Sequence, residues 1–290
     1  MTQDNREQEQ SDNTYLIDAE SALEMARLLD QDKVLTRGMN GIFSEQEDSD
    51  LAGVSHILDV ACGPGGWVHE VARQYPHIKV TGIDISKNTI NYAKAHARVL
   101  NLKNAHFAVM NALKPLDFPD ESFDIVNMRT VVGFVPPDQW ATYLAECKRV
   151  LRSGGIMRLT EGEYGFTNKP AHETFMALLN LAQHRARHSF SPTGHNAGML
   201  PMLRPPLKQI GIQNLQSRSH VIDYSFDMEA HVEGVEDIKY ILELIQPLFF
   251  ATKVITPEEY AKLHEQVLEE IQMEDFSGVT IMLTVWGEKP

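Results

Sequence analysis

The chain has 290 residues, of which 43% are hydrophobic and 23% are charged, so it has ample material for a folded core. Its formal net charge is -14, and an electrostatic field of that sign repels phosphate groups. We therefore expect neither a nucleic acid nor an anionic membrane as the partner. The 2 cysteines are too few for a disulfide framework or a cysteine-based zinc site, and no metal is predicted.

The most polar segment and the most apolar segment of the chain together predict where the protein is located. Residues 1–13 are polar throughout, carry no signal-peptide pattern and are expected to form a disordered tail. The most apolar long stretch, residues 240–255, is interrupted by charged side chains and by Pro247. It is too short to cross a bilayer, so we expect a cytoplasmic protein.

Strand and helix patterns alternate through the first half of the chain. A helical spacing of apolar residues begins near Asp18 and weakens towards Gly38, and an acidic loop follows at residues 45–50. The elements predicted next are strand 56–61, helix 67–74, strand 79–84, helix 87–100, strand 105–110, strand 123–128, helix 137–151 and strand 156–160. This alternation predicts an α/β fold with a doubly wound, mostly parallel sheet and helices on both faces.

The last part of the chain breaks this rhythm. The predicted elements are helix 171–188, loop 191–206, strand 214–226, helices 236–248 and 257–271, and strand 278–286. We interpret residues 1–50 as a tail with cap helices, residues 51–165 as the cofactor-binding core, and residues 166–290 as the rest of the sheet with helical lid insertions. The late helices could instead form a homodimer surface.

The strongest motif is the run from Leu58 to Gly66, L-D-V-A-C-G-P-G-G. A buried strand here ends in a glycine-rich turn that opens a helix, which lets a ligand approach backbone N–H groups at the helix N-terminus. Asp84 ends the next strand, where doubly wound nucleotide-binding folds carry a ribose-binding acid. The two motifs together predict a nucleotide-like cofactor.

Two cofactor classes fit these motifs. A dinucleotide-binding turn requires a third glycine at a position that Val68 occupies in this chain. Asp59 would repel a pyrophosphate but would attract the ammonium group of a methionine moiety. These residues favour S-adenosylmethionine. An NAD(P)-dependent oxidoreductase and a non-catalytic nucleotide-binding protein on the same fold remain the alternatives.

Three runs, D-V-A-C-G-P-G-G, I-D-I-S and R-V-L-R-S-G-G, resemble class I S-adenosylmethionine-dependent methyltransferases of the small-molecule type over residues 55–160. The resemblance implies a Rossmann-like methyltransferase fold with a seven-stranded sheet, closed by an antiparallel C-terminal strand. It also implies an enzyme that methylates an N, O or C atom of a small molecule, such as a secondary metabolite.

The resemblance further implies a set of cofactor contacts: Asp59, Ala61, Gly63, Gly65, Asp84, Ile85, Asn111, Ala112 and Arg129. Asp84 would bind both ribose hydroxyls, and Ile85 would pack against the adenine. Asn111 stands where the family often has aspartate, and its amide carbonyl can still accept a hydrogen bond from the adenine amino group.

Two further segments are candidates for closing the site. The N-terminal segment resembles the cap helices that cover the cofactor in this family, so Tyr15 and Arg37 are expected to contact it. A helix that merely packs against the sheet edge fits the same pattern. His195 lies in a Gly- and Pro-rich loop that can reach the crevice, and we predict it as the catalytic base or as a hydrogen-bond donor to the substrate. An ordinary surface role for His195 is the alternative.

Overall fold

The computed structural model describes residues 14–46 and 51–290. The predicted tail and residues 47–50 of the acidic loop lie outside the described residues.

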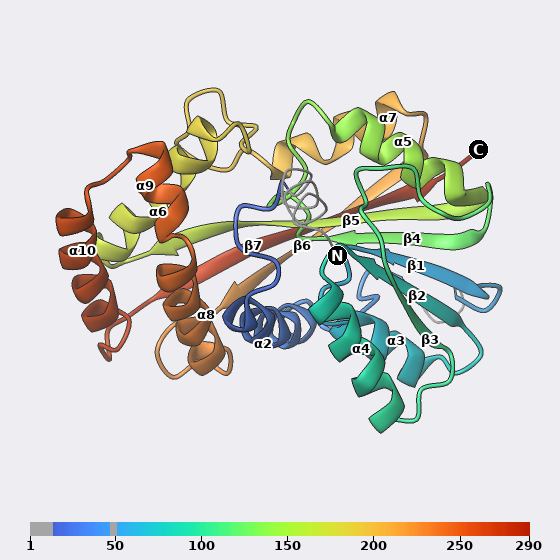
Figure 1. The fold of residues 1–290 in the computed structure, drawn as a ribbon, viewed down its shortest axis with the longest axis horizontal. Helices are drawn as coiled ribbons and strands as arrows, with labels where there is room; N and C mark the ends of the chain where they lie inside the picture. The colour runs from blue at the N-terminus through green and yellow to red at the C-terminus, as the bar shows by residue number, and fades with distance from the viewer. Residues whose placement is uncertain (1–13, 47–50) are drawn as a thin grey trace, which may run out of the picture.

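A seven-stranded sheet runs through the molecule in the order β3-β2-β1-β4-β5-β7-β6 (Figure 1). Its strands are β1 (His56–Val60), β2 (Lys79–Asp84), β3 (Ala105–Val109), β4 (Phe123–Arg129), β5 (Leu151–Thr167), β6 (Gln213–Asp223) and β7 (Gly278–Glu288). Strands β1 to β5 pair in parallel, whereas β7 is antiparallel to both β5 and β6. The predicted doubly wound, mostly parallel sheet is confirmed. Its order reverses between β1 and β4, which is where such folds bind ligands.

Helices cover both faces of the parallel part of the sheet. One face carries α2 (Ala22–Gly38), α3 (Gly66–Gln74) and α4 (Lys87–Val99), and the other carries α5 (Trp140–Val150) and α7 (Arg204–Gln209) (Figure 1). Each face has its own apolar core, with Trp67 and Ile90 on the first side and Trp140 and Leu144 on the second. The rigid sheet between them fixes the positions of the loops at its carboxyl edge.

The remaining helices gather at one end of the molecule, around the projecting ends of β5 and β7 (Figure 1). They are α6 (Pro170–Arg185), α8 (His231–Leu244), α9 (Gln246–Thr252) and α10 (Pro257–Glu270). A third core cluster that includes Phe175, Leu242 and Phe249 holds them together. Across residues 14–46 and 51–290, every helix is too short or too polar to serve as a membrane span.

Several predicted boundaries are wrong, and three of the differences have identifiable reasons. Strand β5 continues to Thr167, because its far half pairs antiparallel with β7. The single helix predicted at 236–248 is two helices, since Pro247 lies in the first turn of α9, where its missing N–H is tolerated. The loop predicted at 191–206 contains the short 3-10 helix η1 (Leu200–Met202) and the start of α7, which also has proline in its first turn.

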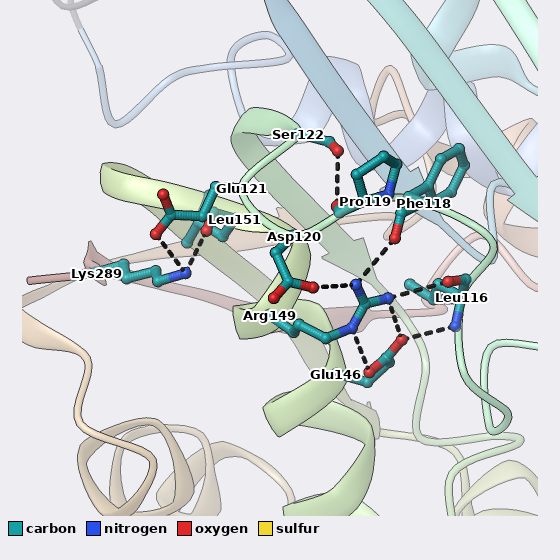
Figure 2. A network of polar contacts seen from close by, with 10 residues as sticks. All are labelled: Leu116, Phe118, Pro119, Asp120, Glu121, Ser122, Glu146, Arg149, Leu151 and Lys289. Carbon is teal, nitrogen blue, oxygen red and sulfur yellow. Dashed lines mark hydrogen bonds and ion pairs between the residues drawn. The ribbon is translucent and has the colours of Figure 1, made fainter.

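A polar network at the C-terminal end of α5 fixes the loop that leads into β4 (Figure 2). Arg149 donates hydrogen bonds to the carboxylates of Glu146 and Asp120. Nearby, the ammonium group of Lys289 lies 3.3 Å from the carboxylate of Glu121. This network lies at the amino end of β4, so it stabilises the edge of the sheet opposite to the ligand crevice.

Candidate cofactor and substrate site

A cavity of about 90 Å³ opens beyond the carboxyl ends of β1 to β4. Eight residues that the sequence predicts as cofactor contacts line it: Tyr15, Ala61, Gly63, Asp84, Ile85, Asn111, Ala112 and Arg129. We call this space the first cavity. The side chains come from the ends of four strands and from the N-terminal segment, and the doubly wound topology brings them together at one edge of the sheet.

The glycine-rich turn between β1 and α3 forms one wall of this cavity. Gly63 has a φ of 53°, and a Cβ atom placed on it would meet only a Leu28 side-chain carbon at 3.7 Å. Its backbone therefore borders open space. Gly65 differs, because a Cβ atom there would lie 2.6 Å from the ring of Phe107 in the core, and its φ is 82°. Packing and the left-handed backbone require this glycine, and it does not line the first cavity.

Asp84 holds the turn and the start of α4 together. Its Oδ2 accepts the N–H of Gly63 at 3.0 Å, and its Oδ1 accepts the N–H of Ser86 at 2.9 Å. Burial raises the pKa of Asp84 above its ordinary value, while these backbone bonds oppose the shift. Each carboxylate oxygen has a second lone pair, so Asp84 can still accept hydrogen bonds from hydroxyl groups in the cavity.

Asp59 ends a buried polar chain that crosses three strands. Asn127 donates to Asp59 Oδ1 at 2.7 Å, and Arg158 donates to Asn127 Oδ1 at 2.7 Å. Arg158 in turn forms a buried ion pair with Glu45. Burial raises the pKa of Asp59 to about 7, although Asn127 and Arg158 lower it. The carboxylate faces a smaller cavity, of about 50 Å³, that shares Ala61 with the first one.

Three members of this chain were not predicted from the sequence: Glu45, Asn127 and Arg158. A signal was present, since Asn127 and Arg158 are polar residues inside strands whose neighbours are apolar. Buried polar groups of this kind require partners. The partner of Arg158, however, comes from a loop distant in sequence, which no local pattern indicates.

Helix α2 lies directly over the glycine-rich turn. Arg129, at the end of β4, forms an ion pair with Asp32 of α2 and donates to Thr36 Oγ1 at 3.1 Å. A Cβ atom on Gly66 would overlap the Asp32 side chain, so α2 approaches the turn as closely as a glycine permits. Arg129 thus joins the sheet to the helix at the border of the first cavity.

Two other predicted residues lie elsewhere. Arg37 forms ion pairs with Glu233 and Glu229 on the molecular surface and lines none of the three cavities. It stands about two and a half turns after Leu28 along α2, so it projects from the opposite face of the helix. His195 is exposed and also lines none of the cavities. Its ring nitrogen Nδ1 lies 2.8 Å from Thr193 Oγ1.

The reason for the position of His195 is that its loop packs against α6. The side-chain amide of Asn180 lies 3.4 Å from the His195 carbonyl oxygen, and Gly194 lies close against the side chain of His184. The loop was expected to reach the crevice above the strands. Contacts with a helix of the last part of the chain hold it away from the cavities instead.

A second, larger cavity adjoins the first. Its volume is about 220 Å³, and it lies between α2, α6, α8 and the strands β5 to β7. Tyr15, Leu28 and Thr130 line both cavities. The two spaces therefore meet at these three residues. Within the described residues, no group of three or more His, Cys, Asp or Glu side chains is arranged to hold a metal ion.

Comparisons with known proteins agree with this arrangement. Residues 57–155 match the family model of a methyltransferase domain. The Aspergillus luteorubrus protein named "Probable methyltransferase ltbC" is 37% identical over 108 residues, which are 35% of this chain and 38% of the fungal protein. Demethylmenaquinone methyltransferase of Lactococcus lactis subsp. lactis is 38% identical over 107 residues, which are 37% of this chain and 41% of that enzyme. The matched segment thus spans about two fifths of the length of these curated relatives.

A solved structure supports the fold beyond the matched segment. A protein of Bacillus halodurans that is classed with the methyltransferases aligns with 87% of this chain and 99% of its own, with 21% sequence identity and a TM-score of 0.53. The sequence match covers the turns that follow β1 to β4 and border the first cavity, and the structural match extends over 87% of this chain. Residues 57–155 therefore match a methyltransferase domain, and the chain as a whole shares its fold with the Bacillus halodurans protein.

Proposed function

We propose that this protein transfers the methyl group of S-adenosylmethionine to an N, O or C atom of a small molecule. The observation that carries the proposal is the pair of adjoining cavities at the carboxyl edge of the sheet. The first is lined by residues of the glycine-rich turn and the following strand ends, and the second is larger and shares Tyr15, Leu28 and Thr130 with it. A donor and an acceptor can therefore be held side by side.

The residues of the first cavity suit the parts of S-adenosylmethionine. Asp84 would accept hydrogen bonds from the ribose hydroxyls, and Ile85 and Asn111 would contact the adenine. The methionine end would lie along Ala61 and Gly63, near Asp59. Asp59 is a buried carboxylate with a raised pKa, so a nearby ammonium group would stabilise its charged form.

S-adenosylmethionine supplies an electrophilic methyl group on a positively charged sulfur. Transfer then requires that the two reacting atoms be held in line, about 3–3.5 Å apart, with water excluded. In this chain Tyr15, Leu28 and Thr130 border both cavities and would position the reacting groups. Helix α2 would act as a lid that excludes water from the reacting groups.

The other predicted properties remain proposals. We propose that residues 51–165 bind the cofactor and that the helices of residues 166–290 shape the acceptor site. A homodimer, the absence of nucleic-acid partners and a cytoplasmic location stay predictions. An NAD(P)-dependent reaction is disfavoured, because a pyrophosphate at the glycine-rich turn would approach the buried Asp59 carboxylate.

Calorimetric titration tests the proposal directly. The protein is expected to bind S-adenosylmethionine and S-adenosylhomocysteine and to show no heat of binding with NAD⁺. Incubation with S-adenosylmethionine and a metabolite extract is expected to yield S-adenosylhomocysteine. Binding of NAD⁺ without binding of S-adenosylmethionine would overturn the proposal.

A further inference from the structure

The second cavity has a mainly apolar wall. Phe175 and Leu179 of α6 line it, together with Ile238 and Ile241 of α8 and Ile245, which follows the end of α8. Phe175 and Ile245 are almost completely buried, so this wall is backed by the packed core of the last part of the chain. A ligand placed here gains binding free energy chiefly by removing its own apolar surface from water.

The charged side chains of this cavity leave no cation free. Arg27 donates to both carboxylate oxygens of Glu24 at 2.7 Å and to Asp237 Oδ1 at 3.1 Å. Among the described residues that line the cavity, Arg27 is the one Lys or Arg side chain, while Asp237 and Glu233 add two carboxylates. An anionic ligand would therefore meet two acids and a guanidinium group that is already paired.

Asp237 and His172 each offer a polar atom that could recognise a ligand. The second carboxylate oxygen of Asp237 accepts no hydrogen bond from any of the described residues, and this side chain is 25% exposed. His172, 1% exposed, also lines the cavity, and its Nδ1 has no partner within the described part of the chain. Burial lowers the pKa of His172 to about 4, so the imidazole is neutral at pH 7 and offers one donor and one acceptor.

An unpaired buried polar atom in an apolar cavity costs free energy unless a ligand forms a hydrogen bond with it. We propose that the second cavity binds the methyl acceptor, and that this acceptor is an uncharged, largely apolar molecule whose hydroxyl groups pair with Asp237 and His172. This inference rests on the proposed function, since it takes the first cavity as the site of S-adenosylmethionine. It adds a substrate class, and it excludes carboxylate and phosphate acceptors.

A pair of naphthalenes substituted at the same positions, one neutral and one dianionic, tests the inference. Calorimetry is carried out on the full chain saturated with S-adenosylhomocysteine, using 2,6-dihydroxynaphthalene and 2,6-naphthalenedicarboxylate. The diol is expected to bind, and the dianion is expected to bind at least about tenfold more weakly because its charge would be buried beside carboxylates. Equal affinity of the two ligands would overturn the inference.

Variants locate the ligand within the molecule. Ile241→Trp fills the cavity from α8, and Leu179→Trp fills it from α6, so each should reduce affinity for the diol by at least about tenfold. Val232→Trp is the matched control, because Val232 is on the same helix as Ile241, is 68% exposed and does not line the cavity. Asp237→Asn should weaken diol binding roughly fivefold, since a charged hydrogen-bond acceptor becomes a neutral one.

Binding of S-adenosylhomocysteine separates the two possible failures. If a filling variant still binds S-adenosylhomocysteine as the parent does, its first cavity is intact and any loss of diol affinity reports on the second cavity. Unchanged diol affinity in both filling variants, or an equal loss in Val232→Trp, would overturn the inference and leave the proposed function standing. Failure of the parent protein to bind S-adenosylhomocysteine would instead refute the proposed function.

Discussion

Replacing Asp84 by asparagine is the most direct test of the first cavity. Both carboxylate oxygens accept a backbone N–H, from Gly63 and from Ser86, and the same oxygens would accept the ribose hydroxyls of the cofactor. Asparagine keeps the shape of the side chain but has one oxygen and one NH₂ group. One of the two acceptors is therefore lost, and the remaining one is uncharged.

The expected magnitude follows from these contacts. A hydrogen bond to a charged group contributes about 1.5–3 kcal/mol, so losing one to a ribose hydroxyl should weaken binding about 10- to 150-fold. The NH₂ group must also face the N–H of Gly63 or Ser86, which leaves one donor without a partner. This second effect should lower the free energy of unfolding by about 1–3 kcal/mol.

The assay is calorimetric titration of S-adenosylhomocysteine, with urea unfolding to measure the loss of stability. Glu20→Gln is the control, because Glu20 accepts the N–H of Lys87 at 3.0 Å and its charge also raises the pKa of Asp84. Glu20 is exposed and does not line the first cavity. The control should bind within about threefold of the parent, as expected for a surface charge. If Asp84→Asn binds as tightly as this control, the ribose assignment is refuted.

Three further predictions concern the surrounding residues. Burial raises the pKa of Asp59 to about 7, and a bound ammonium group would lower it. Calorimetry should therefore find that S-adenosylhomocysteine binds about tenfold more weakly at pH 6 than at pH 8. Equal affinities at the two pH values would contradict a contact between Asp59 and the ammonium group. Because the raised pKa favours the protonated form of Asp59 in the folded protein, Asp59 contributes to the free energy of unfolding of the protein without cofactor. This contribution is fully present below the ordinary pKa of 3.8 and is lost as the pH rises through 7. Arg158→Met should lower the free energy of unfolding in urea by about 3–5 kcal/mol, because it leaves Glu45 buried and unpaired, and a Glu45→Leu second change should recover most of the loss. Gly65→Ala should destabilise the protein by about 1–3 kcal/mol more than Gly154→Ala in the same assay, since both glycines have positive φ but a Cβ atom meets other atoms only at Gly65.

The core of the fold was predictable because its signals are local. Strand β2 begins at Lys79 and ends at Asp84, as the alternation of apolar residues and the terminal acid indicate. The turn after β1 is specified by its own glycines, and Ser86 caps α4 through a hydrogen bond within the same helix. Residues near one another in sequence decide each of these features. The position of Asp84 at the ligand crevice then follows from the doubly wound topology.

The rest depends on contacts between distant segments. The expectation that Arg37 faces the cofactor overlooked Glu233, which lies on α8 and pairs with it. The length of β5 was set by β7, and the position of His195 was set by α6. Charge pairs and strand partners that are separated by more than a hundred residues leave no periodic pattern. A single sequence therefore indicates the first cavity more clearly than the second.

Helix α2 borders both cavities and links the N-terminal segment to α8. Glu24 lines the first cavity, while Arg27 one turn later lines the second, and the ion pair between them is buried. Asp32 packs on the glycine-rich turn, and Arg27 also reaches Asp237 on α8. A displacement of α2 would therefore change both cavities at once. Under the proposed function, the helix that covers the donor would also form a wall of the acceptor site, so binding of one ligand would influence the binding of the other.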